Sequence, residues 1–366
     1  MIRILHVIGT LANGGMESFL LNLYRHVDRS RIQFDFVVGS QNGWCQSYAD
    51  EIRNLGGEIY TLPAGLKGIR AFQSLLLQHP DYQIIHCHRD AMSTLFLLVA
   101  RFVGRKLLIS HSHSASETGW VKQVATVALL PLLNKLALYR LACGREAGEH
   151  LYHGYAYRVI PNAIDLSAFT YKQERAEIVR RNLGFFPDDL VIGHVGRFEK
   201  VKNHSFLLDV FSRLHTRDPR MKLLLVGSGS LKEAMVHQVE ALGLHRSVVF
   251  LEQRTDIPDL LQAMDLVVFP SFYEGFSMAM VEMQAAGLRI LASDQIPQEV
   301  NITGSVTFKS LKDGSEQWAQ AASSLLAYRR EAVPVHKLYE YGLDIHESAR
   351  AIQQFYEQVQ IEFQNR

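Results

Sequence analysis

The chain has 366 residues, of which 48% are hydrophobic and 20% charged, an ordinary globular composition that excludes the disordered and fibrous classes. Its 38 Lys and Arg against 37 Asp and Glu leave a net charge of +1, so a general polyanion binder is excluded and no nucleic-acid partner is expected. The length indicates two domains. Residues 1–165 hold 16 basic and 12 acidic side chains, and residues 166–366 hold 22 and 25, so the first half is mildly basic.

Short apolar runs and amphipathic helical patterns alternate along the first half of the chain. This alternation predicts βαβ units whose strands form a parallel sheet, covered by helices on both faces. The expected strands are 2–8, 34–38, 59–62, 84–87, 107–110, 140–143 and 157–160, and the expected helices are 16–26, 47–55, 69–77 and 91–103.

Pro161 and Asn162 interrupt this pattern, and a polar segment with helical character follows at 165–184. The alternation then resumes with expected strands at 191–195, 222–226, 248–251, 266–269 and 289–292, and helices at 205–215, 231–242, 257–263 and 277–286. We predict an α/β protein of two Rossmann-like, doubly wound domains, 1–165 and 166–345. An apolar helical face at 347–363 predicts that the terminal segment 346–366 packs back toward the first domain.

The three cysteines form no C-x-x-C pair, which indicates reduced thiols in a cytoplasmic protein. The N-terminal residues 1–10 have the pattern of a buried first strand rather than of a signal peptide. The longest apolar stretch, 124–133, is about half of the roughly 20 residues that a spanning helix needs, so no transmembrane segment is expected.

The strongest chemical pattern is PSFYEGFSMAMVEMQAAG at 270–287. Glu274 and Gly275 follow an expected strand, and a helix begins near Ser277 and has Glu282 in its first two turns. A glycine lets a ligand approach the backbone, free N–H groups at a helix start hold phosphate, and carboxylates accept hydrogen bonds from sugar hydroxyls. We interpret the block as a ligand site rather than as a capped helix with one solvated glutamate.

A second pattern, GHVGRFEKVKNHSFLLD at 193–209, has Arg197 and Lys202 after a strand that ends near Gly196. Doubly wound sheets bind ligands at the carboxyl ends of their strands. Arg binds phosphate through two N–H groups and Lys adds a point charge. The alternative is a solvated basic turn, but the block at 270–287 favours an anion site.

Two weaker patterns follow strands of the first domain. Gly14 and Gly15 precede the first helix, but G-x-G-x-x-G is incomplete there, so an ordinary strand-to-helix loop explains them equally well. His111 and His113 lie just past an expected strand end, where a histidine could orient a hydroxyl or stabilise charge. No third metal ligand is recognisable beside them. The histidines of HCHRD at 86–90, and His6, are expected to be structural.

The segment 119–145 contains Lys122, Lys135, Arg140 and Arg145 but no acidic residue between 119 and 145, and it has Trp120 near its start. This composition suits a helical segment that lies on anionic lipid. An ordinary pair of core helices explains the same residues, and the sequence leaves both interpretations open.

Taken together, these motifs resemble the retaining nucleotide-sugar glycosyltransferases of the GT-B fold in family four, especially bacterial members that build exopolysaccharide or capsule. The resemblance rests on ANGGMES, ISHSHS, VIPNAID, VGRFEKVKN, LLVGSGSL and FPSFYEGFSMAMVEMQAAG, which occur in the expected order over nearly the whole chain. The E-x7-E block together with VGRFEKVKN is highly specific, whereas the double glycine is not. The resemblance implies two Rossmann-like domains that face a cleft, with the acceptor bound by the first domain and the donor by the second.

The resemblance also implies roles by motif position. Arg197 and Lys202 would bind the donor diphosphate and stabilise it as the leaving group. Glu274 would contact the donor sugar and Glu282 the ribose hydroxyls. His113 would be the active-site histidine near the sugar, with His111 as the alternative register. The other implied donor contacts are Gly14 and Gly15 near the phosphates, Gly227 near the base, and the backbone of Gly275, Phe276 and Ser277.

Family members retain the anomeric configuration, and a front-face mechanism is favoured for them. No Asp-x-Asp occurs in the chain, and this is the pair with which metal-dependent transferases of the other common fold hold Mn²⁺ or Mg²⁺. We therefore predict no metal and no cofactor beyond the nucleotide-sugar co-substrate, for which the family favours a UDP-sugar. The expected acceptor is a glycan or a lipid-linked glycan, and 119–145 would give peripheral contact with the inner face of the cell membrane.

The chain departs from the family pattern at two places, which puts donor selectivity in doubt. Glu252 and Gln253 stand where members often have Gly, and Arg289 stands where many have Pro. Three alternatives share this type of fold or its nucleotide chemistry: a UDP-sugar 2-epimerase, a nicotinamide-dependent oxidoreductase, and a non-catalytic sugar-nucleotide-binding protein. The intact charged motifs argue against the first, and the lack of G-x-G-x-x-G argues against the second.

Overall fold

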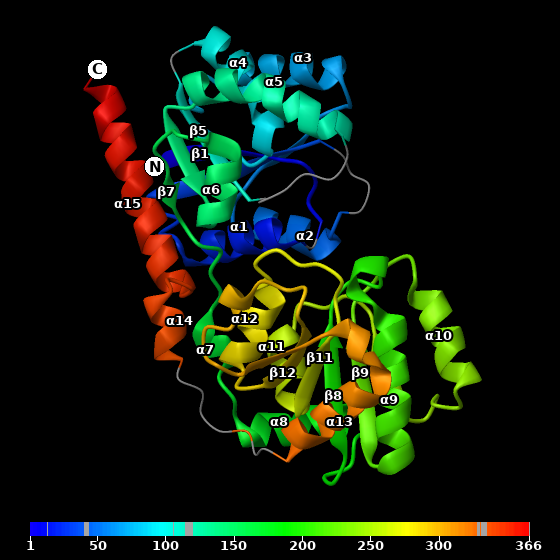
Figure 1. Ribbon diagram of the computed structural model, residues 1–366. Helices are drawn as coiled ribbons and strands as arrows, with labels where there is room; N and C mark the ends of the chain where they lie inside the picture. Colours follow the sequence, from blue (N-terminus) through cyan, green and yellow to red (C-terminus); the bar gives the residue numbers. More distant parts are fainter. Residues whose placement is uncertain are drawn as a thin grey trace. The chain divides into compact units, whose positions relative to one another are not determined.

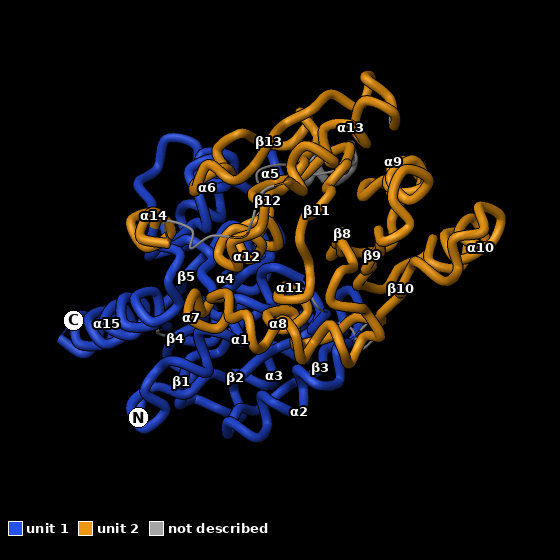
Figure 2. Tube along the Cα trace, turned by 90° about the horizontal axis from the view of Figure 1, so that it is seen from below, with its two compact units in different colours: residues 1–164, 342–366 blue, residues 165–341 orange. Residues whose placement is uncertain are grey.

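The computed structural model describes residues 1–12, 14–39, 44–104, 106–113, 120–327, 330 and 335–365, apart from the side chains of 120–125 (Figure 1). Contacts divide the chain into two compact units, Met1–Ile164 with Gly342–Arg366 and Asp165–Tyr341 (Figure 2). Each unit is built on one parallel sheet. This confirms the predicted α/β class with two Rossmann-like domains.

The first unit has a seven-stranded sheet in the order β3-β2-β1-β4-β5-β6-β7. The chain runs outward from β1 to β3 and then returns to the other side of β1, so the strand order reverses between β1 and β4. Every residue of β2 is buried, as expected for a sheet covered on both faces. The strands are β1 Ile2–Ile8, β2 Ile32–Val38, β3 Ile59–Thr61, β4 Ile84–Cys87, β5 Leu107–Ser112, β6 Tyr139–Ala142 and β7 Arg158–Val159.

Helices cover both faces of this sheet. One hydrophobic core joins the sheet to α1, α2 and the terminal helix α15, and a second joins the opposite face to α3, α4, α5 and α6. The helices are α1 Gly15–His26, α2 Gln46–Asn54, α3 Leu66–Gln78, α4 Ser93–Val103 after the short η1 Asp90–Met92, α5 Trp120–Leu136, α6 Arg145–Tyr152 and α15 Ile345–Gln364.

The terminal helix α15 belongs to the first unit although it follows the second unit in the sequence. The backbone N–H of Ile164 donates to Leu343 O and that of Ile345 to Ile164 O, both at 3.0 Å, so the two crossings between units lie side by side. Asp344 caps the helix by accepting a hydrogen bond from the backbone of Glu347. The fully buried Tyr356 packs its ring against the sheet.

The second unit has a six-stranded parallel sheet in the order β10-β9-β8-β11-β12-β13, and its strand order reverses between β8 and β11. A core that includes the buried Trp318 joins the sheet to α9, α10 and α13, and α11 packs against α7 and α8. The strands are β8 Leu190–Val195, β9 Met221–Val226, β10 Val248–Leu251, β11 Leu266–Phe269, β12 Arg289–Ser293 and β13 Val306–Lys309. The helices are α7 Leu166–Phe169, α8 Gln173–Asn182, α9 His204–Arg217, α10 Lys232–Ala241, α11 Ile257–Ala263, α12 Met278–Ala285, α13 Gly314–Leu326 and α14 His336–Glu340, with the short turns η2 Lys200–Lys202, η3 Gln298–Val300 and η4 Leu311–Asp313.

These bounds correct some expectations from sequence and confirm others. The strand expected at 107–110 continues to Ser112, so His111 lies within β5 rather than past its end. Within the basic segment 119–145, the helix covers Trp120–Leu136, and the strand expected at 140–143 forms as β6. No elements were expected from sequence where β13, α13 and α14 form. Among the described residues, none of the helices is both long enough and apolar enough to cross a membrane.

Candidate functional site

The loops that follow β8 and β11 meet at the point where the strand order of the second unit reverses. The backbone N–H of Phe272 donates to Val201 O at 2.8 Å, and the Asn203 side-chain amide donates to Pro270 O at 3.2 Å. Asn203 can make this contact because it takes the left-handed conformation, with φ of 55°, immediately before α9. The two loops therefore hold each other at the edge where doubly wound sheets bind ligands.

Lys202 and Glu274, from these two loops, form an ion pair. Lys202 Nζ lies 2.6 Å from Glu274 Oε1, and the two side chains are 14% and 13% exposed. The ammonium also lies 4.8 Å from the centre of the Phe269 ring, a cation–π contact. Arg197, on the same loop as Lys202, has an exposed side chain. The edge thus has a cation that is already paired, Lys202, and a further cation, Arg197, that faces solvent.

The two glycines at this edge, Gly227 and Gly275, differ in whether the packing of the protein requires a glycine. Gly227 follows β9 with φ of +151°, and a Cβ there would lie 2.1 Å from Gly196 O, so only glycine lets the β9 loop lie against the β8 loop. A Cβ on Gly275 would meet nothing within 4 Å. The backbone at Gly275 therefore borders open space, and the protein's own packing does not require a glycine there.

Helix α12 begins directly after this loop, with Ser277 as its buried N-cap residue. Glu282 lies in the second turn, and burial raises the pKa of its carboxyl to about 7. Phe276, which is 40% exposed, stacks on Tyr341 with ring centres 5.8 Å apart. This part of the edge therefore offers a helix start, an exposed aromatic ring and a carboxyl group with a raised pKa.

Glu252 and Gln253, the residues that depart from the family pattern, are tied to the neighbouring loop. Glu252 pairs with Lys232, and Gln253 accepts a hydrogen bond from the Ser228 hydroxyl at 3.0 Å. These contacts hold the end of β10 against the loop after β9, beside Gly227.

At the carboxyl edge of the first sheet, the double glycine opens α1. Gly15 is the first residue of the helix and Gly14 is its N-cap, whose carbonyl accepts from the backbone of Ser18 at 2.9 Å. A Cβ on Gly15 would meet nothing within 4 Å, and one on Gly14 would meet only the flexible Glu17 side chain. The structure therefore gives no packing reason for glycine at either position.

Five histidines cluster at the same edge of the first sheet, on its α15 face. His6 Nδ1 lies 3.0 Å from His88 Nε2, and His88 Nδ1 lies 2.9 Å from His113 Nε2. His86 Nδ1 lies 2.6 Å from the Tyr356 hydroxyl. His111 is buried between them, with its ring stacked 5.4 Å from that of His86. The expectation that no third imidazole stands beside His111 and His113 is therefore wrong.

Burial keeps these imidazoles neutral. Desolvation lowers the pKa of His6 and of His113 to about 3 and takes those of the other three well below the usual histidine range. A signal for this cluster does exist in the sequence: His-x-His occurs at the ends of two successive strands, and alternate residues point to the same face of a sheet. The signal requires knowing that β4 and β5 are neighbours.

The two edges differ in what they can do chemically. The second unit offers fixed positive charge, hydrogen-bond acceptors and open backbone, a combination that binds a phosphorylated, hydroxyl-rich molecule. The first unit offers neutral imidazoles and a glycine-rich helix start. The structure brings Arg197, Lys202, Gly227, Glu274, Gly275, Phe276, Ser277 and Glu282 into one unit and Gly14, Gly15 and His113 into the other.

Known proteins share both halves of this architecture. The family model described as Glycosyltransferase Family 4 matches residues 13–168, and that described as Glycosyl transferases group 1 matches residues 189–328. A putative glycosyltransferase, EpsF, of Bacillus subtilis is 32% identical over 97% of this chain and 96% of its own length. An Escherichia coli UDP-Gal:alpha-D-GlcNAc-diphosphoundecaprenol alpha-1,3-galactosyltransferase is 26% identical over 72% of each chain.

Solved structures support the same assignment of fold. Anabaena Alr3699/HepE, in complex with UDP and glucose, superposes with a TM-score of 0.72 over 96% of this chain and 95% of its own, at 20% identity. A sucrose-phosphate synthase from Thermosynechococcus elongatus gives 0.73 over 99% and 100%, at 17% identity. The chain is a glycosyltransferase of the GT-B type. It belongs to the glycosyl transferases group 1, with the N-terminal domain of glycosyltransferase family 4.

Proposed function

We propose that this chain is a retaining glycosyltransferase that moves a sugar from a UDP-sugar to a glycan or lipid-linked acceptor in the synthesis of a cell-surface polysaccharide. The observation that carries the proposal is the Lys202–Glu274 ion pair at the strand reversal of the second unit, with the exposed Arg197 beside it. A cation can stabilise the negative charge on a departing diphosphate, and a carboxylate beside it can accept hydrogen bonds from the sugar hydroxyls.

In the proposed step, the bond between the anomeric carbon and the donor's phosphate oxygen breaks while the acceptor oxygen bonds to the same face of that carbon. The acceptor's proton passes to the departing phosphate oxygen, so the UDP that leaves is protonated and no base from the protein is consumed. Lys202 and Arg197 stabilise the charge that grows on the diphosphate. Glu274 positions the sugar, and Glu282 accepts from the ribose hydroxyls.

The names of relatives support the choice of substrates. The Escherichia coli relative is named for a UDP-galactose donor and a diphosphoundecaprenol-linked acceptor, and the Bacillus subtilis relative is a putative glycosyltransferase. The Anabaena neighbour was crystallised with UDP, with UDP and glucose, and with UDP-glucose. A UDP-sugar donor and an acceptor linked to a lipid diphosphate are the substrates that the names of these relatives favour.

We propose that the transfer step needs no Mg²⁺ or Mn²⁺, because Lys202 and Arg197 supply the positive charge that a metal supplies elsewhere. The test is the rate of transfer during a short assay in EDTA, compared with the rate in added Mg²⁺ or Mn²⁺. Equal rates are expected, and a strict requirement for either ion would contradict the proposal.

We also propose that the outer face of α4 and α5, which pack side by side, contacts anionic membrane (Figure 1). Phe102 on α4 is 79% exposed and Val127 on α5 is 71% exposed, and Lys135 is exposed on the last turn of α5. Arg140 is not available for this purpose, because its guanidinium donates to the side chain and backbone of Asn134.

The membrane contact is tested by co-sedimentation with vesicles that contain anionic phospholipid. Replacing Phe102, Val127 and Lys135 by Ser, Ser and Gln should release most of the protein. The matched control is Phe186→Ser, which removes a side chain of similar exposure (71%) from the second unit. Equal sedimentation of the triple variant and the control would contradict this part of the proposal.

The transferase proposal is tested in two stages. A thermal-shift panel of nucleotide sugars identifies the donor, because a ligand that binds only the folded state raises the melting temperature. The best donor is then incubated with lipid-linked acceptors, and the anomeric configuration of the product is read by NMR. Transfer with retention is expected. Inversion, conversion of the donor to an epimer without transfer, or binding without turnover would each overturn the proposal.

A further inference from the structure

The histidine cluster of the first unit is built by three neighbouring strands. His6 of β1 is the register partner of His86 in β4, and β5 follows on the other side of β4. His88 follows β4 two residues after His86, so its side chain returns to the same face of the sheet. The buried edge of one sheet therefore brings together imidazoles from distant parts of the sequence.

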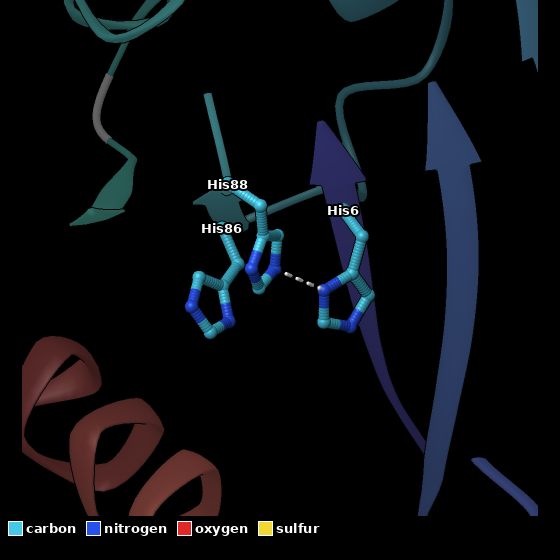
Figure 3. Close-up of side chains that lie close together, drawn as sticks. All are labelled: His6, His86 and His88. Carbon is cyan, nitrogen blue, oxygen red and sulfur yellow. Dashed lines mark hydrogen bonds between the residues drawn. The ribbon is translucent and has the colours of Figure 1, made fainter. Parts of the chain in front are cut away.

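Three members of the cluster satisfy the geometry of a metal site. His6, His86 and His88 are all buried, and one ring nitrogen from each lies within 4.8 Å of the others. Figure 3 shows the three rings grouped beside β1 and β4, with His6 and His88 in direct contact. In a tetrahedral zinc site with Zn–N distances of about 2.0–2.1 Å, nitrogens lie about 3.4 Å apart, close to the 3.0 Å of His6 Nδ1 and His88 Nε2.

The contacts around two of these rings, those of His86 and His88, also suit a metal. A histidine that binds a metal through one nitrogen usually donates from the other to an oxygen or another acceptor, which fixes its tautomer. His86 has Nδ1 against the Tyr356 hydroxyl at 2.6 Å and leaves Nε2 without a partner among the described residues. His88 has Nδ1 against His113 Nε2 at 2.9 Å. With protons on these Nδ1 atoms, His86 Nε2 and His88 Nε2 both present a lone pair, and that of His88 faces His6 Nδ1.

The alternative trio, His88, His111 and His113, also has its nitrogens within 4.8 Å of one another. It shares His88 with the first trio, so the two trios would compete for that residue unless His88 bridged two ions. Both ring nitrogens of His111 are buried without a partner in the described part of the chain, so no hydrogen bond seen there holds its tautomer. The first trio is favoured because Tyr356 and His113 hold the rings of two of its members.

We propose that His6, His86 and His88 bind one divalent transition-metal ion of the zinc type, in a structural site that fastens α15 to the first sheet through Tyr356. Neutral imidazoles are the ligands that zinc, cobalt and nickel share, and a trio made only of imidazoles disfavours magnesium and calcium. The three histidines would fill three of the ion's four coordination positions and leave the fourth to a ligand that is not one of them. The site lies in the first unit and uses none of the residues assigned to donor binding, so it stands independently of the transferase proposal.

The test measures metal binding directly with the full chain. The protein is stripped by prolonged dialysis against a chelator and then titrated at neutral pH with Zn²⁺, and with Co²⁺ as a spectroscopic probe. One tight equivalent of Zn²⁺ per chain, the visible absorption of four-coordinate Co²⁺, and a rise in melting temperature with Zn²⁺ are expected. His86→Gln should weaken the tight equivalent at least tenfold.

Two further variants keep the test decisive if His86→Gln folds poorly. Tyr356→Phe keeps all three rings but removes the hydroxyl beside His86, and should weaken Zn²⁺ binding by about 10-fold to 100-fold. His111→Gln is the matched control, since His111 is equally buried in the cluster but outside the trio, and should leave the affinity unchanged. Absence of a tight equivalent in the parent protein, or a greater loss in His111→Gln than in His86→Gln, would overturn the proposal.

Discussion

At the carboxyl edge of the first sheet, four buried histidines and the partly buried His113 form a cluster of neutral rings. At the corresponding edge of the second sheet, the loops carry fixed charges, which are the mostly buried pair of Lys202 and Glu274 and the exposed Arg197. Both edges lie where the strand order reverses, so topology alone prepares the same place in each unit. The difference teaches that the same topology can carry different chemistry, which is decided by side chains of the strands themselves in the first unit and by the loops after the strands in the second.

Removal of the exposed positive charge of Arg197 should have the largest effect on activity among these predictions. Arg197→Ala is expected to lower kcat/KM for the donor about 10²- to 10³-fold, the usual cost of losing one group that stabilises developing negative charge. Steady-state transfer of sugar from the donor measures this. His113→Asn provides the comparison, since its ring is neutral: both variants should lose activity, but only Arg197→Ala should reduce the dependence of donor KM on salt. A normal rate in Arg197→Ala would show that the charged edge does not bind the diphosphate.

The second prediction separates packing from ligand contact at two glycines of the charged edge. Gly227→Ala should destabilise the protein by at least about 2 kcal/mol, because the new methyl group meets Gly196 O in an unfavourable backbone conformation. Gly275→Ala should change stability by less than about 0.5 kcal/mol and still raise the donor KM. Urea unfolding and donor kinetics measure the two effects. Equal stability of the two variants would disprove the close approach of the β8 and β9 loops.

The third prediction concerns the ion pair itself. Lys202→Met leaves the Glu274 carboxylate without its partner in a mostly buried place and should cost about 1–3 kcal/mol, whereas combining Lys202→Met with Glu274→Gln should recover part of that loss. Arg213→Met is the matched control, because its pair with Glu316 is exposed and should contribute less than about 0.5 kcal/mol. A double-mutant cycle in urea with no coupling would argue that the pair does not form.

The smallest effect is a dependence on pH. The folded Glu282 carboxyl, with its pKa raised to about 7, keeps a proton that the unfolded chain loses near pH 4.5. Stability should therefore fall as pH rises between these values, and Glu282→Gln should remove about 1–3 kcal/mol of that fall. Urea midpoints of both proteins at pH 5 and pH 8 measure the difference. A Glu282→Gln protein with the same pH profile as the parent would contradict the raised pKa.

Most strands of both sheets could be predicted, because strands covered on two faces consist of apolar runs, and most of the expected runs form strands. β13 and α13 escaped for a physical reason. β13 has only four residues, of which Thr307 is exposed, and α13 packs largely through Trp318 and small alanines, so neither gives a strong periodic signal. A terminal helix was expected because α15 has a continuous apolar face.

The candidate site was predictable only as far as local motifs reach. Each motif of the second unit lies on one loop and the following helix, so Arg197, Lys202 and Glu274 could be chosen from sequence. Their pairing could not, since it depends on β8 and β11 being neighbours although they lie far apart in the sequence. The histidine cluster could not be predicted for the same reason. Its prediction requires the order of β1, β4 and β5, and single histidines carry no periodic pattern of their own.

The adjacent crossings at Ile164 and Leu343 make the second unit an insertion within the first. On the ribosome, residues 165–341 are therefore complete before the first unit can be, because α15 is made after them. Until then the face of the first sheet that Tyr356 covers has no helix α15 over it. The second unit can therefore fold while the first unit still awaits its terminal helix.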